Sequence, residues 1–322
     1  MNVLYINSGY KGIYSYFDLW IKELNSEQIN IIDIPVNINL NILKNTLLTI
    51  ELSFVLIMIG NKNPNQLLKI IKETNVPIIS WFTEDPFYND VSLEVLPYSD
   101  YILSIDKSSC DFYSKLGYQN IHYFPLATNE HVFKSINIEK DIDLLLVGYP
   151  YPNRIKLIQS IINSTNFSIV LIGKNWEKHL RIPNHKKRKI QFINYWIPPN
   201  EVNIWYNKAK IILNPHREST FHWNKNSNNV LNRSVNNRFF DIALSGGFQL
   251  INDEIDIFID EKIEKLIRYS DENSCINLIK KYINTPSYRQ DIINALLLKI
   301  KGKNTFSNRI DNLFKIIEEK TK

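Results

Sequence analysis

The chain has 322 residues, enough for about two domains, and 44% of them are hydrophobic, which is typical of a globular protein. Its net charge of +5 is modest, and the basic run at 185–189 reads as a solvated loop, with an anionic acceptor or a membrane surface as the alternative. Cys110 and Cys275 lack metal-ligand spacing, and no apolar run is long enough to span a membrane. We therefore expect a cytoplasmic protein that binds no nucleic acid, with peripheral membrane contact left open.

Short apolar runs alternate with helix-like stretches through the first part of the chain. The run at 54–59 is uninterrupted, as in a central parallel strand covered on both faces. Such a βαβ rhythm predicts a parallel sheet. Strands are expected at 3–6, 29–34, 54–59, 76–81, 101–104 and 121–124, with helices around Tyr16, Leu19, Trp20 and Leu24 and at 67–71.

A polar patch ending at Lys140 marks the expected domain boundary, which gives an N-terminal domain at 1–135 and a second domain at 136–300. The same rhythm restarts beyond the patch. Two α/β halves joined by a linker imply a cleft that holds small molecules. Strands are expected at 144–147, 168–172, 190–192, 210–213 and from 248, and helices at 155–162, 201–209, 239–244, 266–267, 275–283, 288–299 and 306–319.

The polar segments after the strand at 210–213 carry the first candidate site residues. Ligands of open α/β sheets bind beyond the carboxyl ends of the strands, and this stretch brings Arg217, Arg238 and Asp241 there. Two guanidiniums and a carboxylate suit a phosphate-bearing ligand with a hydroxylated sugar, although Arg238 and Asp241 could instead form a surface ion pair. Gly246 and Gly247 close the same helix and could be only its C-cap.

The loop after Val147 is a second candidate. It contains neither GxGxxG nor GxxxxGK[ST], so a dinucleotide fingerprint and a P-loop are both unsupported. Gly148, Tyr149, Asn153 and Arg154 lie at a helix start, where a cation suits a diphosphate. The alternative, a tight turn with Arg154 on the surface, carries equal weight.

Two further strand ends contribute candidates of the second domain. Lys174 follows the strand at 168–172, and Tyr195, Trp196 and Ile197 follow the strand at 190–192. The two aromatic rings could stack on a base while backbone groups read its edge. Both rings could equally be packing residues, which is the favoured interpretation for Trp196.

The first domain offers weaker signals. Asp85 ends a strand in Glu84-Asp85-Pro86 and is expected to face the cleft, where paired carboxylates could act as a base, bind sugar hydroxyls or cap a helix. Gly9 and Gly12 would let the backbone approach a ligand. The carboxylates of Asp141 and Asp143 precede their strand, and His216 and His222 have no matching ligand set, so no metal site is predicted.

The chain resembles the CgeB-like (spore maturation protein) branch of the group 1 glycosyltransferases. The likeness is carried, in order along nearly the whole chain, by WFTEDP at 81–86, DIDLLLVGYPYPNR at 141–154, EVNIWYNKAKIILNPH at 201–216, RFFDIALSGGFQL at 238–250 and NTFSNRIDNLF at 304–314. It implies a GT-B fold, which is two Rossmann-like domains whose parallel sheets face a cleft. It also implies that the last region, 301–322, crosses back to the first domain.

The resemblance further implies sugar transfer from a nucleotide-diphosphate donor, with a UDP-sugar favoured, to a hydroxyl of a protein or glycan acceptor. No metal or other cofactor is implied. By position, Arg154 and Arg238 would face the diphosphate, with help from Arg217. Asp241 would take the ribose position, and 195–197 would border the base; Gly9, Gly12, Gly148, Tyr149, Asn153, Lys174, His216, Gly246 and Gly247 complete the predicted substrate-binding set.

This sequence departs from the family at two acid positions. Asp241 stands where the family usually has Glu, and Arg233 stands where the wider retaining group has a second acid. The segment 219–235 is also long and rich in Asn, as in a mobile lid or a plain insertion. We expect a retaining transferase, or an inverting one with Asp85 as base; the alternative is a non-catalytic sugar-binding or spore-coat protein on a degenerate GT-B fold.

Overall fold

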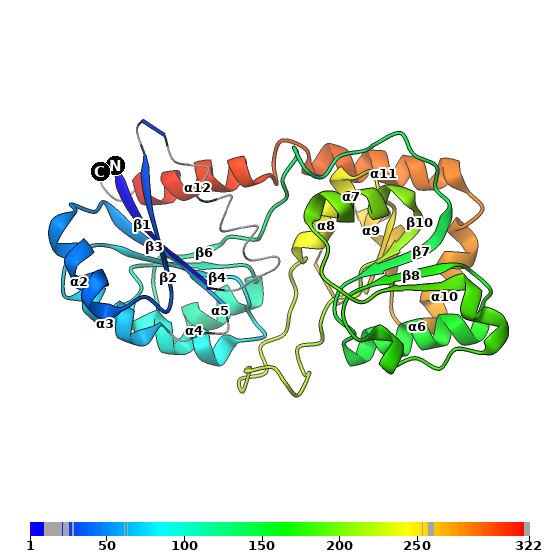
Figure 1. Ribbon diagram of the computed structural model, residues 1–322, viewed down its shortest axis with the longest axis horizontal. Coiled ribbons are helices and arrows are strands. Elements are labelled where there is room, and N and C mark those ends of the chain that lie inside the picture. Colours follow the sequence, from blue (N-terminus) through cyan, green and yellow to red (C-terminus); the bar gives the residue numbers. More distant parts are fainter. Residues whose placement is uncertain are drawn as a thin grey trace. The chain divides into compact units, whose positions relative to one another are not determined.

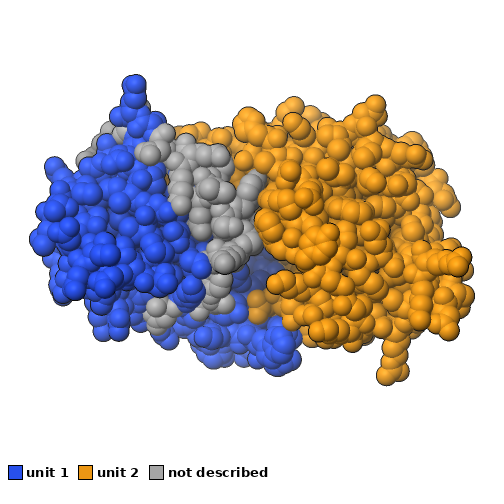
Figure 2. All heavy atoms as spheres, in the orientation of Figure 1, with its two compact units in different colours: residues 1–125, 219–234 blue, residues 126–218, 235–322 orange. Residues whose placement is uncertain are grey.

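The computed structural model describes residues 1–9, 21, 26–27, 29–60, 62, 64–252, 254–256 and 261–318. The chain forms two compact units, coloured separately in Figure 2. Unit 1 comprises 1–125 and 219–234, and unit 2 comprises 126–218 and 235–322. The division falls at Pro125, earlier than the boundary expected from the sequence, and 219–234 joins the first unit. The predicted crossing of the last region to the first domain concerns how the units meet and stays a prediction.

Unit 1 is built on a sheet of six parallel strands in the order β2-β1-β3-β4-β5-β6. All six residues of β3 are buried between β1 and β4, which confirms the central strand predicted at 54–59. The strands are β1 (Asn2–Asn7), β2 (Asn30–Pro35), β3 (Phe54–Ile59), β4 (Ile78–Phe82), β5 (Tyr101–Ser104) and β6 (Ile121–Tyr123).

One face of this sheet is covered by helices that follow the strands along the chain (Figure 1). Because side chains alternate along a strand, Leu4 and Ile6 point into this layer, where they pack with Leu43, Leu68 and Tyr113. The helices are α2 (Leu40–Thr49), α3 (Asn65–Lys72), α4 (Asn89–Val95) and α5 (Lys107–Lys115), with the 3-10 turn η1 (Leu96–Tyr98) after α4.

Unit 2 repeats the plan with six parallel strands in the order β12-β11-β10-β7-β8-β9. Its first strand lies in the middle of the sheet, as in the first half of a doubly wound fold. The strands are β7 (Ile142–Val147), β8 (Ile169–Ile172), β9 (Ile190–Ile193), β10 (Ala209–Leu213), β11 (Gln249–Asn252) and β12 (Arg268–Tyr269).

Helices cover both faces of the second sheet, with α6 and α10 on one side and α7, α8 and α11 on the other (Figure 1). Local signals set several starts: Pro152 and Pro199 open α6 and α7, and Asp271 and Ser274 form a capping box on α10. The helices are α6 (Pro152–Ser164), α7 (Pro199–Lys208), α8 (Asn237–Leu244), α9 (Glu261–Ile267), α10 (Glu272–Tyr282), α11 (Pro286–Ile300) and α12 (Phe306–Glu318), with 3-10 turns η2 (Trp176–Lys178) and η3 (Asn184–Lys189).

The expected helices and strands of the second half are confirmed to within a few residues at their ends. The predicted first helix lies outside the described residues. Among the residues that the structure describes, no helix is both long enough and apolar enough to cross a membrane.

Candidate functional site

The candidate site lies where the strand order of unit 2 reverses. The chain runs from β7 outward to β8 and β9, then returns to β10 on the other side of β7. In open α/β sheets, such a reversal between the loops after neighbouring strands is the usual position of a ligand, which here means the loops after β7 and β10. The first loop carries Gly148 and leads into Arg154, and the second carries Asn214, His216 and Arg217.

Arg154 joins these two loops and is buried, with 3% of its surface exposed. Its Nε donates to the carbonyl of Pro215 at 3.0 Å, and a terminal nitrogen donates to the carbonyl of Tyr149 at 3.0 Å. The guanidinium also lies 4.8 Å from the centre of the Tyr151 ring. The alternative that placed Arg154 on the surface of a tight turn is therefore wrong.

Arg238 reaches the same place from the first turn of α8. Its Nε donates to the side-chain oxygen of Asn214 at 3.2 Å. Gly148 has a φ of +144°, and a Cβ built there would lie 2.7 Å from a terminal nitrogen of Arg154 and 3.1 Å from one of Arg238. The two predicted phosphate-binding arginines thus meet over the same glycine.

The charges of this pair are not neutralised by carboxylates. Within the described part of the chain, neither Arg154 nor Arg238 lies in an ion pair. Burial, and then the charge of Arg238, lower the pKa of Arg154; burial also lowers that of Arg238. Desolvated cations that form no direct ion pair favour a multiply charged anion, which a diphosphate supplies.

A third cation is attached through an aromatic ring that sequence reasoning missed. The ring of Tyr151 lies 4.8 Å from the guanidinium carbon of Arg154 and 5.0 Å from that of Arg217, one cation–π contact for each. Arg217 therefore joins the cluster, as expected. Tyr151 lies one position before Pro152 in a loop rich in Tyr and Pro, and its position in the sequence gave no sign of this role.

Asp241 lies on α8 three residues after Arg238 and is 4% exposed. Burial raises the pKa of its carboxyl to about 7, against the effects of Thr128, Asn237 and Arg238. The side-chain nitrogen of Asn237 donates to one of its oxygens at 3.1 Å. Asp241 and Arg238 form no ion pair within 4.0 Å, so the bland alternative of a surface ion pair is wrong.

Side chains between the strands hold the cluster together, and most of them were missed. Asn214 is buried and contacts the side chains of Asn236, Arg238 and Gln249. Asn236 caps α8 by accepting from the backbone of Phe239, and no local pattern in the sequence ties it to Asn214, whose position follows β10. An N-cap Asn before an apolar run was the one available signal.

His216 serves this framework. Its Nε2 accepts from the backbone N–H of Asn236 at 2.9 Å, and its carbonyl accepts from the side chain of Asn153 at 2.7 Å. Burial, and then the nearby Arg238 and Arg154, lower the pKa of its imidazole to about 3, so the ring is neutral. His216 and Asn153, both predicted to bind substrate, are thus part of the scaffold that joins the two loops.

The residues predicted to border the base divide into two kinds. Tyr195 and Trp196 are 63% and 52% exposed, so neither ring is part of the unit's core, whereas Ile197 is buried in it. Lys174 is exposed in the loop after β8. The preceding Gly173 was not singled out, yet a Cβ there would lie 2.3 Å from the carbonyl oxygen of Gly148.

Gly246 and Gly247 do not belong to the arginine cluster. They follow the C-terminal end of α8, whereas Arg238 lies in its first turn. Gly246 has a φ of +67°, and a Cβ on Gly247 would lie 2.6 Å from Ile212. A left-handed turn at Gly246 and close packing of Gly247 against β10 agree with the C-cap alternative, and the substrate-binding role of the two glycines stays a prediction.

In unit 1, Asp85 was expected to face a cleft, and the structure buries it instead. Its carboxylate is 1% exposed and accepts hydrogen bonds from the hydroxyls of Ser92 and Ser104, both at 2.7 Å, and of Tyr113 at 2.9 Å. This carboxylate is therefore not open to solvent, because the chain after β4 places it among three hydroxyls of unit 1. Gly9 has a φ of +66° in the loop after β1, and Gly12 lies outside the described residues.

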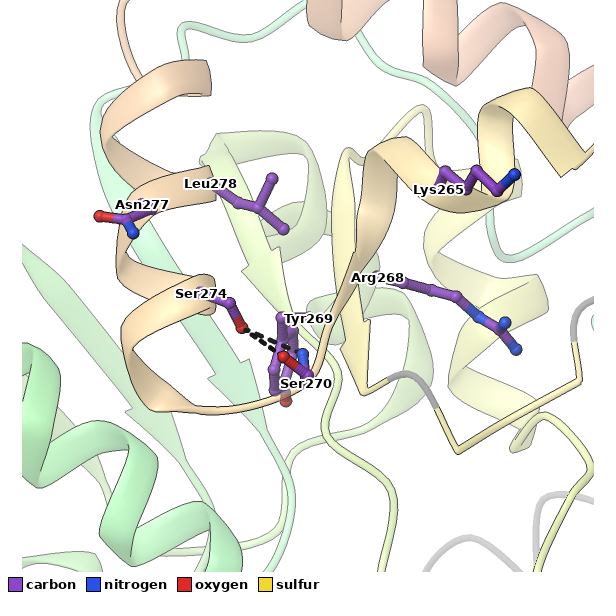
Figure 3. A pocket seen from close by; sticks show the side chains of 7 residues that line it. All are labelled: Lys265, Arg268, Tyr269, Ser270, Ser274, Asn277 and Leu278. Carbon is purple, nitrogen blue, oxygen red and sulfur yellow. Dashed lines mark hydrogen bonds between the residues drawn. The ribbon is translucent and has the colours of Figure 1, made fainter.

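A cavity of about 500 Å³ lies away from the predicted site, beside the edge strand β12. Figure 3 shows Ser270 and Ser274 pointing toward each other, with Lys265 and Arg268 extending away from them. Those two cations pair with Glu261 and Glu264, and the hydroxyl of Ser274 accepts from the backbone of Ser270 and Asp271. Because its polar groups serve local structure, this cavity is a weaker candidate than the arginine cluster.

The basic run at 185–189 also serves local structure. Lys186 donates to the carbonyl of Thr165 at 2.8 Å, and Lys189 donates to that of Asn166 at 2.8 Å. Both carbonyls follow the C-terminal end of α6, where cations are favourable.

Comparison with known proteins defines the class. A family model described as "Glycosyl transferase-like" matches residues 154–315. T4 phage β-glucosyltransferase in complex with UDP-glucose superposes with a TM-score of 0.64 at 17% identity, over 98% of this chain and 99% of that one. The E. coli structure "Trehalose-6-phosphate from E. coli bound with UDP-2-fluoro glucose" gives 0.63 at 7% identity, over 98% and 99%. These matches define a glycosyltransferase-like chain with the GT-B fold, as the sequence predicted.

A curated relative narrows the class. The chain is 38% identical over 298 residues to "Spore protein CgeB" of Bacillus subtilis (strain 168), and the match covers 90% of each chain. The protein therefore belongs to the CgeB-like branch of the GT-B glycosyltransferases.

Proposed function

We propose that the protein transfers a sugar from a nucleotide-diphosphate donor to an acceptor hydroxyl. The observation that carries the proposal is the pair of guanidiniums, Arg154 and Arg238, which meet over Gly148 without a carboxylate partner among the described residues. A diphosphate bound there would neutralise the positive charge of the two guanidiniums. The UDP-sugars in the T4 phage and E. coli structures favour UDP as the nucleotide of the donor.

The arginines would act mainly on the leaving group. In the transfer, the bond from the anomeric carbon to the phosphate oxygen breaks, and negative charge grows on the β-phosphate. Arg154, Arg238 and Arg217 would stabilise that charge, which is electrostatic catalysis by preorganised cations. We expect these fixed charges to make a metal unnecessary, so activity should persist in EDTA.

We further propose that the anomeric configuration is retained. The acceptor oxygen would bond to the anomeric carbon on the side that the diphosphate leaves, and its proton would pass to the departing phosphate. Inversion needs a separate base, and Asp85 is a poor one because its carboxylate already accepts three hydroxyl hydrogen bonds in a buried site.

The proposal is tested by incubating the protein with UDP-, GDP- and dTDP-sugars, with and without EDTA, and measuring nucleotide release. Arg238→Ala should lower the rate by about 100-fold, the usual scale for removing one such donor, while leaving the melting temperature within a few degrees. Arg188→Ala, which removes an exposed arginine of η3, is the matched control and should behave as wild type.

Turnover by Arg238→Ala at the wild-type rate would remove the arginine mechanism. Nucleotide binding by the wild type without any turnover would instead favour a non-catalytic sugar-binding protein. That second candidate is favoured by one observation: Asp241 stands where the family usually has Glu, and the shorter side chain weakens its reach to a ribose.

A further inference from the structure

The segment 219–234 interrupts unit 2 at its candidate site and belongs to unit 1. It begins two positions after Arg217 and ends four positions before Arg238. Both ends of the segment are therefore close in sequence to the arginines proposed to hold the diphosphate. A restraint on the segment is transmitted to them through only a few peptide bonds.

The middle of the segment is held at the start of α4. The carboxylate of Asp90 accepts from the backbone N–H of Ser227 at 3.0 Å and from its hydroxyl at 2.7 Å. The backbone of Lys225 bonds in both directions, donating to Phe87 and accepting from Asp90, each at 2.9 Å. The bonds between Asp90 and Ser227 are solvent-exposed, so each contributes little by itself.

The end of the segment is held by a buried carboxylate. Asp106 is fully buried, and one of its oxygens caps α5 by accepting from the backbone of Ser109 at 3.0 Å. Its other oxygen accepts from the backbone N–H groups of Arg233 at 3.0 Å and Ser234 at 3.1 Å. The hydroxyl of Ser234 in turn accepts from the backbone of Lys107 at 3.0 Å. One carboxylate thus fixes both a helix start and the end of the segment.

One residue, Val235, separates this anchor from Asn236 in the framework of the candidate site. Asn236 caps α8, donates its backbone N–H to His216 and exchanges side-chain hydrogen bonds with Asn214. Asn214 also accepts from Arg238. The residues that Asp106 anchors are thus joined through Val235 to the residue that caps α8 and contacts Asn214.

We propose that Asp106 is a positioning residue for the donor site: by anchoring Arg233 and Ser234, it preorganises the chain that presents Arg238. The inference rests on the proposed function, because it assigns donor binding to Arg238. Preorganisation lowers the entropy that a ligand must remove when it orders its site. Releasing the anchor should weaken donor binding even though Asp106 would not touch the donor.

The test compares Asp106→Asn with Asp271→Asn in the full chain. Asn is about as good an N-cap as Asp, so both variants keep their helix starts. Only at Asp106 does the change replace an oxygen that two backbone N–H groups need. Asp271 caps α10 and has no bond to the segment among the described residues, which makes it the matched control.

Three quantities are measured: the dissociation constant for UDP by calorimetry, the melting temperature, and hydrogen exchange at the amides of Arg233 and Ser234. In Asp106→Asn we expect faster exchange at both amides and UDP binding weakened by about fivefold or more, the usual lower range for coupled sites. Asp90→Asn should weaken binding less, because the buried anchor remains. Asp271→Asn should leave both exchange and binding unchanged.

The outcomes separate the two levels of the proposal. If the wild type binds UDP and Asp106→Asn binds it equally well while the two amides exchange faster, the positioning role is overturned and the proposed function stands. If Asp106→Asn and Asp271→Asn both lose affinity for UDP in proportion to their loss of melting temperature, the effect is general destabilisation. That result also overturns the inference. If the wild type binds no nucleotide, the proposed function and this inference are overturned together.

Discussion

Asp85 of unit 1 and Asp241 of unit 2 are alike in burial and differ in partners. Both are nearly inaccessible, and burial raises the pKa of each carboxyl to about 7. Asp85 accepts hydrogen bonds from three hydroxyls, whereas Asp241 accepts one from the side-chain amide of Asn237 at 3.1 Å. A raised pKa alone therefore does not identify a functional carboxyl, because the first is already satisfied by its own fold.

The buried arginines of unit 2 also show that the partners of a charged group matter more than its burial. Arg154 donates hydrogen bonds to the carbonyls of Pro215 and Tyr149. Neither Arg154 nor Arg238 forms an ion pair with a carboxylate in the described part of the chain. Internal hydrogen bonds fix the geometry of both guanidiniums and leave them without a direct ion pair. A buried charge that forms no direct ion pair within the fold is a better indication of a ligand site than a shifted pKa alone.

Gly148→Ala should disturb Arg154 and Arg238 at once, and it therefore has the largest expected effect. A Cβ would lie 2.7 Å and 3.1 Å from their terminal nitrogens, so at least one guanidinium must move. We expect donor turnover to fall by about 100-fold or more, the scale for losing one charge-stabilising donor. The measurement is nucleotide release at saturating donor.

Gly302→Ala is the matched control for Gly148→Ala. Gly302 also has a positive φ, +68°, but no atom lies within 4 Å of a Cβ placed there. It should cost about 1 kcal/mol of stability from the left-handed backbone and leave turnover unchanged. Equal loss of turnover in the two variants would show that backbone strain, and not displacement of the arginines, is responsible.

The sequence predicted the sheets well because burial on both faces leaves a direct mark. Phe54–Ile59 is an unbroken apolar run, and the structure makes it a strand buried throughout. Arg154 and Arg238 were found because charges at the carboxyl ends of parallel strands gather at one edge. This rule predicts at which edge of the sheet a residue lies and not how deeply its side chain is buried. Asp85 was therefore predicted to face a cleft, whereas its carboxylate is buried among three hydroxyls.

Contacts between distant segments could not be predicted in the same way. The segment 219–234 reads as a lid or an insertion, and its anchoring depends on Asp106, more than a hundred positions away in the sequence. Tyr151 is one of two tyrosines in its loop, and only the folded chain brings two guanidiniums to its ring. Local periodicity carries no information on such pairings.

A second way to test the comparison is Asp85→Asn. An amide can accept hydrogen bonds through only one oxygen, so at least one buried hydroxyl among Ser92, Ser104 and Tyr113 loses its acceptor. We expect the free energy of unfolding to fall by about 1–3 kcal/mol, with turnover per folded molecule close to wild type. Chemical denaturation and turnover are measured together, with exposed Asp111→Asn as control. Loss of turnover without loss of stability would restore Asp85 as a base.

The two carboxyls have the same direction of effect on stability, but only Asp241 is expected to affect donor binding. Both folded-state pKa values, about 7, lie above the value of 3.8 for a free Asp. Their contribution to the free energy of unfolding is therefore fully present below pH 3.8 and is lost as pH rises toward and through 7. Donor binding should follow ionisation only for the carboxyl that contacts the ligand.

The smallest expected effect is therefore the pH dependence of donor affinity. An ionised Asp241 accepts ribose hydroxyls better than the neutral acid, and with a pKa of about 7 its ionised share rises from roughly a tenth at pH 6 to nine-tenths at pH 8. Wild type should bind UDP-glucose up to about tenfold more tightly at pH 8, and Asp241→Asn should show no such change. UDP-glucose is the suitable ligand because it lacks the terminal phosphate that titrates near pH 6. Asp85→Asn should keep the wild-type profile, since its carboxyl is enclosed by unit 1; a flat profile in that variant would reverse the roles given to the two residues.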